Sequence, residues 1–199
     1  MRRAITLATL RRSESGATIV EFAMILPVLC LLLLGTFDLG YRSYVSSIIQ
    51  GSLHEAARMA TVGGIQTSAI EAHVASRLRS FSRNATVTTR TLSYSDFNGV
   101  KIPETITQDT APLGTYNVGD CYQDSNNNSH YDLDRGATGL GGAEDVVYFE
   151  VTMTYPHIVP IGHFIPGSRW DNNVTITQNT VLRNQPFAGR TLTNTVRCN

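Results

Sequence analysis

An uncharged apolar stretch near the N-terminus constrains this chain more than any other feature of its sequence. Residues 22–37 contain no charged side chain, and the apolar character begins at Ala17. A helix over residues 17–37 would be about 31 Å long at about 1.5 Å per residue, which matches the hydrocarbon core of a bilayer. The sequence therefore predicts a transmembrane helix over residues 17–37, with Glu21 as its one ionised side chain.

The basic residues before this stretch predict its orientation. Residues 1–16 contain four arginines and one glutamate, whereas the rest of the chain contains 12 basic and 15 acidic residues. The positive-inside rule places such a basic segment in the cytoplasm, so everything after about Gly40 would lie on the far side of the membrane. No nucleic-acid partner is expected, because 16 Lys and Arg are balanced by 16 Asp and Glu over the whole chain.

Other N-terminal signals fit the sequence less well. A secretory signal peptide needs small residues at a cleavage site after Leu34, where the chain reads GTFDLGYR. A lipoprotein signal needs small residues before Cys30, where the chain reads PVL. A twin-arginine signal needs apolar residues after Arg12, where the chain reads SES.

Glu21 decides between a plain anchor and a functional helix. A carboxylate inside a membrane helix costs a few kcal/mol, so its default interpretation is functional. If a protease cuts between Gly16 and Ala17, Glu21 becomes the fifth residue of the mature chain. The new α-amine of Ala17 would be positively charged, because the reference pKa of such an amine is about 8. That amine can pair with Glu21 of a neighbouring subunit when helices pack in a staggered arrangement.

Residues 16–23, which read GATIVEFA, are followed by Leu-Pro and a run of leucines. This pattern resembles the TadE-like pseudopilins of bacterial tight-adherence (Tad/Flp) pilus systems. The resemblance implies that a prepilin peptidase removes residues 1–16, that Ala17 becomes the N-terminus and that Glu21 is the assembly carboxylate. It also implies an inner-membrane location with a single span. The expected partners are the peptidase, other pseudopilins, the major Flp pilin, the inner-membrane assembly platform and membrane lipid.

Two departures from the major Flp pilin favour a minor pseudopilin. The major pilin is a very short protein with tyrosine after the glutamate, whereas this chain has Phe22 there and 183 residues after Gly16. Whether such a subunit enters the filament, primes it or stays in the membrane is left open.

After residue 37 the helix is expected to continue over residues 38–62 as an amphipathic segment, with the apolar positions Val45, Ile48, Ile49, Leu53, Ala56 and Ala60. The pair Gly63-Gly64 is expected to end it. A second short helix follows, in which Ser68 and Glu71 form a capping box. Its apolar stripe is Ile70, Val74, Leu78 and Phe81.

Beyond this second helix the sequence has the alternating pattern that is typical of β-strands. Alternation is clearest over residues 146–155, where Val147, Phe149, Val151, Met153 and Tyr155 share one face. Residues 86–94 and 174–183 are further strand candidates. The predicted fold is α+β and pilin-like: a long N-terminal helix with a membrane-spanning first half, and a small antiparallel β-sheet in a periplasmic domain over residues 63–199.

A long polar loop over residues 119–144 separates these strands. Within it, oxygen-bearing side chains follow the spacing of a calcium loop, at Asp124, Asn126, Asn128, Asp132 and Asp134. Ser129 replaces the usual turn glycine, and Arg135 replaces the bidentate glutamate. The favoured interpretation is a solvated Asn- and Asp-rich loop without a cofactor, and calcium binding is the alternative.

Three cysteines occur in two different settings. Cys30 lies in the apolar stretch and is interpreted as a small apolar side chain. Cys121 and Cys198 lie in polar surroundings and are expected to form a disulfide if the domain is in an oxidising compartment such as the periplasm.

The sequence contains no recognisable catalytic set, so an enzyme is not expected. The His54-Glu55 pair lacks the second histidine of a zinc protease helix, and Glu55 is expected to pair with Arg58 instead. His157 and His163 are interpreted as loop residues. Two function classes remain: a pilus-assembly pseudopilin, and a membrane-anchored extracytoplasmic binding module, calcium-dependent or not, whose N-terminus is never cut.

Overall fold

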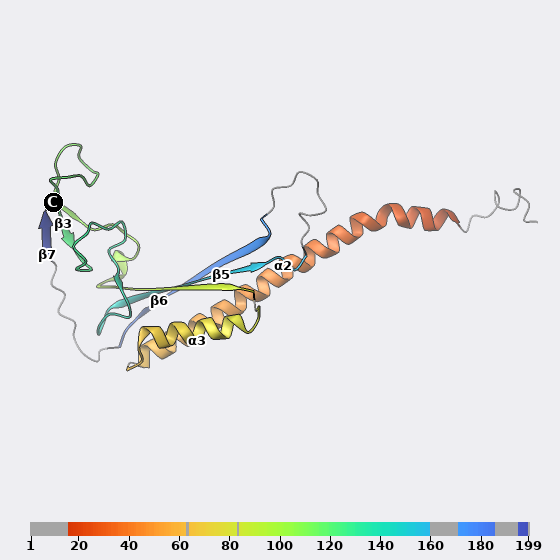
Figure 1. Ribbon diagram of the computed structural model, residues 1–199, viewed down its shortest axis with the longest axis horizontal. Coiled ribbons are helices and arrows are strands. Elements are labelled where there is room, and N and C mark those ends of the chain that lie inside the picture. Colours follow the sequence, from red (N-terminus) through yellow and green to blue (C-terminus); the bar gives the residue numbers. More distant parts are fainter. Residues whose placement is uncertain (1–15, 63, 83, 160–170, 186–194, 199) are drawn as a thin grey trace, which may run out of the picture.

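The computed structural model describes residues 16–62, 64–82, 84–159, 171–185 and 195–198. Most of the leader, Gly63 and His163 lie outside these ranges. The first element is helix α2 (Ala17–Val62), a single helix of 46 residues that continues through Pro27. At about 1.5 Å per residue it is about 69 Å long. Its N-terminal half extends beyond the rest of the protein (Figure 1).

Helix α2 changes character along its length. Residues 17–34 are exposed around the whole circumference of the helix. From Asp38 onward, one face is buried at the positions Val45, Ile49, Leu53, Ala56 and Ala60. One-sided burial of α2 therefore begins close to residue 38, where the apolar stretch of the sequence ends.

Helix α3 (Thr67–Arg79) packs against the C-terminal half of α2 and buries Ile70, Val74 and Leu78. The predicted capping box is wrong, because the N-cap is Gln66 and no side chain caps the helix. Glu71 instead accepts a hydrogen bond from the Thr91 hydroxyl at 2.7 Å. Phe81 lies beyond the end of the helix and is 44% exposed, so it does not belong to the buried stripe.

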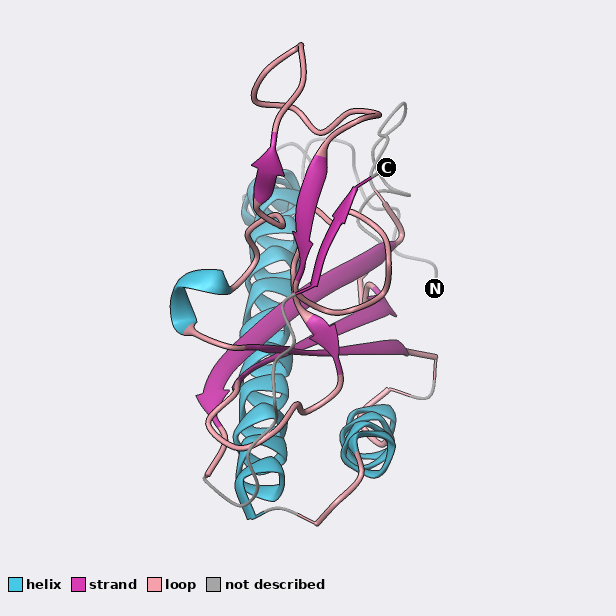
Figure 2. Cartoon of the chain, turned by 90° about the vertical axis from the view of Figure 1, so that its left-hand side faces the viewer, coloured by secondary structure: helices cyan, strands magenta, loops and turns pink. Residues whose placement is uncertain are grey.

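Four antiparallel strands form the main sheet in the order β4-β1-β5-β6. They are β1 (Thr86–Tyr94), β4 (Ala137–Thr138), β5 (Val146–Pro156) and β6 (Asn173–Arg183). The three long strands confirm the predicted ones to within one residue. Phe149, Val151, Met153 and Tyr155 of β5 join the α2 and α3 side chains in the main core. Figure 2 shows the long helix passing behind the strands.

A second sheet of three short strands, in the order β2-β3-β7, was not predicted from the sequence. Its strands are β2 (Ile106–Gln108), β3 (Cys121–Asp124) and β7 (Thr195–Cys198). Strands β3 and β7 lie at the end of the protein opposite the projecting half of α2 (Figure 1). A small second core of Leu92, Tyr94, Val146 and Tyr148 lies on the main sheet.

Candidate functional site

The Gly16–Ala17 peptide bond lies where α2 begins. Helix α2 starts at Ala17, and Gly16 is exposed just before it. A Cβ atom placed on Gly16 would have no neighbour within 4 Å. The predicted cleavage site is therefore sterically open, at the boundary between the leader and the helix.

Glu21 lies one helical turn after Ala17 on the exposed half of α2. The side chains around it are apolar and exposed, including Val20, Phe22 and Ile25. Within the part of the chain that the structure describes, Glu21 takes part in no ion pair. A carboxylate on an apolar helix surface that the described residues leave uncompensated is available to a partner.

The first half of α2 has the length and composition of a single-pass membrane anchor. Its most apolar 18-residue window is entirely unburied by the rest of the protein. A core helix of a soluble protein would be covered by other elements, so this exposure distinguishes α2 from one. Cys30 lies on this surface and is a free, exposed cysteine.

A cluster of charged groups, which was not foreseen, marks the point where α2 reaches the sheet domain. Asp38 is nearly buried, and its Oδ1 lies 3.1 Å from His157 Nδ1 at the end of β5. Its Oδ2 accepts a hydrogen bond from Arg42 Nε at 3.0 Å. Arg42 Nη2 lies 3.5 Å from His157 Nε2. A neutral imidazole satisfies both contacts, because Nδ1–H donates to the carboxylate and Nε2 accepts from the guanidinium.

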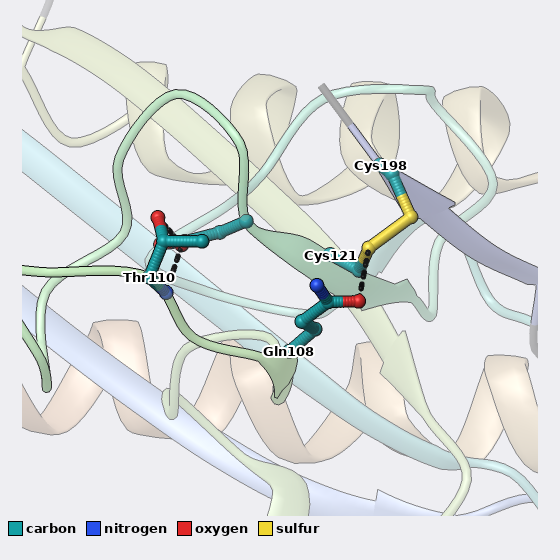
Figure 3. The surroundings of a disulfide bond; sticks show 5 residues. Gln108, Thr110, Cys121 and Cys198 are labelled. Atoms are coloured by element: carbon teal, nitrogen blue, oxygen red, sulfur yellow. Dashed lines mark hydrogen bonds between the residues drawn. A yellow bond between two sulfur atoms is a disulfide. The ribbon is translucent and has the colours of Figure 1, made fainter.

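A disulfide joins Cys121 of β3 to Cys198 of β7, across a sequence separation of 77 residues. The two cysteines are direct cross-strand partners. Gln108 of β2 lies beside them, with its Oε1 3.6 Å from Cys121 Sγ (Figure 3). Arg197 of β7 adds a second link, because its Nε lies 2.6 Å from Oδ2 of the buried Asp124.

The predicted calcium-loop residues form a network of hydrogen bonds among themselves. Asp124 accepts backbone N–H bonds from Asn128 and Ser129 at 3.1 and 2.9 Å, in addition to the Arg197 contact. Asp132 accepts side-chain amide bonds from Asn126 and Asn128. Ser129 has a φ of 68°, the left-handed conformation that glycine adopts at this position of a calcium loop.

Asp134, the fifth predicted ligand, is engaged elsewhere. It accepts a hydrogen bond from the Tyr94 hydroxyl at 2.8 Å and pairs with Arg90 at 3.3 Å. Among the described residues, no group of three or more His, Cys, Asp or Glu side chains is placed to hold a metal ion. Calcium binding therefore stays a prediction that rests on sequence spacing.

Buried carboxylates that the sequence did not single out support this loop. Glu104 is 2% exposed and accepts backbone N–H bonds from Ser125 and Asp132. Burial raises the pKa of Glu104, and these two hydrogen bonds oppose that rise. Hydrogen bonds from Thr110 hold the pKa of the Asp120 carboxyl below its usual value.

We expect millimolar calcium to leave the unfolding temperature of the full chain unchanged. Protein donors already satisfy the loop carboxylates, and the guanidinium of Arg197 would compete with a cation for Asp124. Thermal unfolding in detergent, with and without calcium and with magnesium as the control ion, tests this. A rise of several degrees with calcium alone would support the calcium-dependent binding module instead.

Glu55 does not pair with Arg58 as predicted. It pairs with Arg77 of α3 at 3.1 Å and with His73 at 3.2 Å, so it links the two helices. Helix α3 packs beside α2, and this packing brings Arg77 and His73 within contact distance of Glu55.

A family model described as TadE-like protein matches residues 16–58. The matched segment begins at Gly16, includes Glu21 and the apolar half of α2, and ends in the amphipathic half. The resemblance inferred from the N-terminal residues is thereby confirmed over that segment. Comparison with curated proteins and with solved structures found no match.

Proposed function

We propose that this TadE-like chain is a minor pseudopilin in the assembly of a tight-adherence (Flp-type) pilus. Helix α2 anchors it in the bacterial inner membrane, with its N-terminus in the cytoplasm and the sheet domain in the periplasm. The observation that carries the proposal is the coincidence of three features within the matched segment 16–58. Among the described residues, these are an open Gly16–Ala17 bond at the start of α2, a Glu21 without an ion pair one turn later, and a helix surface that no element covers.

Processing by a prepilin peptidase explains the arrangement of the N-terminus. The leader arginines keep the Gly16–Ala17 bond at the cytoplasmic face. Gly16 has no side chain, so it leaves room for a peptidase that binds the backbone in an extended conformation. After cleavage, the Ala17 amine is the natural partner of Glu21 on a neighbouring subunit.

The exposed half of α2 is then the surface for other subunits. Helices in a membrane associate through close side-chain packing and paired polar groups rather than through a hydrophobic driving force. This half offers both, because its apolar side chains are free and Glu21 is unpaired within the described chain. Other pseudopilins, the major Flp pilin and the assembly platform are the proposed partners.

A membrane-anchored binding module with an uncut N-terminus is the alternative. The polar loop favours it, because Asn126, Asn128 and Asp132 line a polar cleft of about 770 Å³ that also includes Glu71 and Arg90. The state of the N-terminus separates the two functions.

Coexpression with the cognate prepilin peptidase is expected to shorten the chain by the 16 leader residues, so that it begins at Ala17. Gly16→Leu should block this cleavage, because a branched side chain next to the scissile bond obstructs the peptidase. N-terminal sequencing of the membrane-extracted protein is the measurement.

Gly35→Leu is the matched control. A Cβ atom at Gly35 has no neighbour within 4 Å, so this variant tests whether an added leucine disturbs α2 itself. It should be cleaved like the wild type. An uncut wild-type chain would exclude the pseudopilin proposal, and a chain that begins after Phe37 would identify a secretory signal peptide.

A further inference from the structure

An apolar groove lies where α2 meets the end of strand β5. It has a volume of about 830 Å³ and is lined mainly by Leu34, Phe37, Tyr41, Tyr44, Ile158 and Val159. Several of these side chains are open to the surroundings, since Phe37 is 74%, Ile158 57% and Tyr44 55% exposed. The groove thus combines residues of α2 with two residues that follow β5 in sequence.

Its position along α2 places the groove at a membrane surface. Counted from Ala17 at about 1.5 Å per residue, Phe37 lies about 30 Å along the helix axis and Tyr44 about 40 Å. A bilayer has a hydrocarbon core of about 30 Å and a total thickness of about 40–45 Å with its headgroups. If the hydrocarbon core begins at Ala17, the far headgroup layer runs from about 30 Å to about 35–38 Å along the axis. Phe37 and Tyr41 then lie in this layer, and Tyr44 lies at its outer edge, on the side of the sheet domain.

The charged groups in this layer are paired within the protein. Asp38, the first charged residue after Glu21, is nearly buried and contacts His157 and Arg42. Because Ile158 and Val159 directly follow His157, its contact with Asp38 also holds these two residues beside that part of the helix. The charged groups therefore face one another, while apolar and aromatic side chains face outward.

We propose that this groove binds a membrane lipid. Residues 157–159 then attach the sheet domain to the bilayer, in addition to the attachment through α2. The groove continues the apolar surface of the membrane-spanning half of α2, so lipid that surrounds that half reaches it directly. Tyrosine side chains favour the interfacial layer, where the ring meets apolar groups and the hydroxyl meets water. This contact orients the sheet domain on the membrane, and it does not depend on the role in pilus assembly.

A nitroxide spin label placed by Ile158→Cys tests the proposal in the full chain. The chain carries Cys30→Ser, keeps the Cys121–Cys198 disulfide and is reconstituted into vesicles of phosphatidylethanolamine and phosphatidylglycerol. Collision rates of the label with oxygen, which concentrates in lipid, and with a water-soluble nickel chelate are measured by power saturation. Val118→Cys is the control, because Val118 is 91% exposed and lies near β3 in the other sheet.

We expect the oxygen-to-nickel collision ratio at position 158 to be severalfold higher than at position 118. A high nickel rate at position 158 would mean that the groove faces water, and would overturn the proposal. Low rates with both reagents would mean that protein, such as a second copy of the chain, covers the groove, and would also overturn it. A high nickel rate at position 118 verifies in the same preparation that the control loop is accessible to water.

Discussion

Replacing both disulfide cysteines, by Cys121→Ser together with Cys198→Ser, is expected to lower the free energy of unfolding by about 2–5 kcal/mol. The bond joins residues that are 77 positions apart in the sequence, so it removes many conformations from the unfolded chain. Closing a longer loop removes more of this entropy, which places the expected effect in the upper part of that range.

The folded state gives a second reason for a large effect. Strand β7 has four residues and, among the described strands, pairs with β3 alone. Val196 is 57% exposed, so β7 buries little apolar surface of its own. Without the disulfide, the contacts that remain include four residue pairs with β3, the Arg197–Asp124 ion pair and a hydrogen bond from Arg197 to Asn127. A strand with so few contacts is the part of the sheet that opens first.

Urea unfolding of the full chain in mild detergent, followed by near-ultraviolet circular dichroism, measures the change. Cys30→Ser is the matched control and should leave the midpoint unchanged, because Cys30 is exposed and forms no disulfide. Thiol labelling of the unreduced, denatured wild type should modify Cys30 alone. A double variant as stable as the wild type would contradict the stabilising role of the bond.

The long elements of this fold could be predicted because each carries a strong periodic signal. Strand β5 alternates over 11 residues, and α2 repeats its apolar positions over several turns. These patterns do not fix where a helix begins or how a strand pairs with its neighbour, because contacts with other segments decide both. The N-terminus of α3 shows this, because Glu71 bonds to Thr91 of β1 rather than capping its own helix.

The second sheet could not be predicted because its strands are too short to show alternation. Strands β2, β3 and β7 have three, four and four residues. Buried carboxylates organise this region: Asp120 accepts bonds from the backbone N–H and hydroxyl of Thr110, and Glu104 accepts bonds from the polar loop. In the sequence these carboxylates look like ordinary surface residues, since Asp and Glu are rarely buried.

The candidate site also has a part that could be predicted from the sequence and a part that could not. Gly16 and Glu21 could be proposed from the sequence because their spacing from each other and from the apolar stretch is local. The Asp38–His157 contact was missed because its partners are 119 residues apart. Asp38 alone carried a signal in the sequence, because an aspartate directly after a membrane span needs a compensating partner.

Glu21→Gln is expected to abolish most pilus assembly while leaving the fold intact. Within the described chain Glu21 makes no ion pair, so no described contact is lost when the charge is removed. Where subunits pack side by side, the carboxylate would meet the Ala17 amine of a neighbour in a low-dielectric setting. Removing one partner of a buried ion pair costs about 3–5 kcal/mol, because the other charge is left uncompensated. Such a loss weakens each subunit contact by about a hundredfold or more.

A pilus count in a strain that carries Glu21→Gln as its one copy of the gene tests this, together with cross-linking between pseudopilins. Membrane insertion, cleavage after Gly16 and the Cys121–Cys198 bond should match the wild type, which separates assembly from folding. Glu14→Gln is the matched control: it makes the same chemical change, but in the segment that the proposed cleavage after Gly16 would remove. If Glu21 merely marks the end of the membrane span, removing its charge would favour insertion slightly. Wild-type pilus numbers would then be expected, and that result would rule out the assembly role of Glu21.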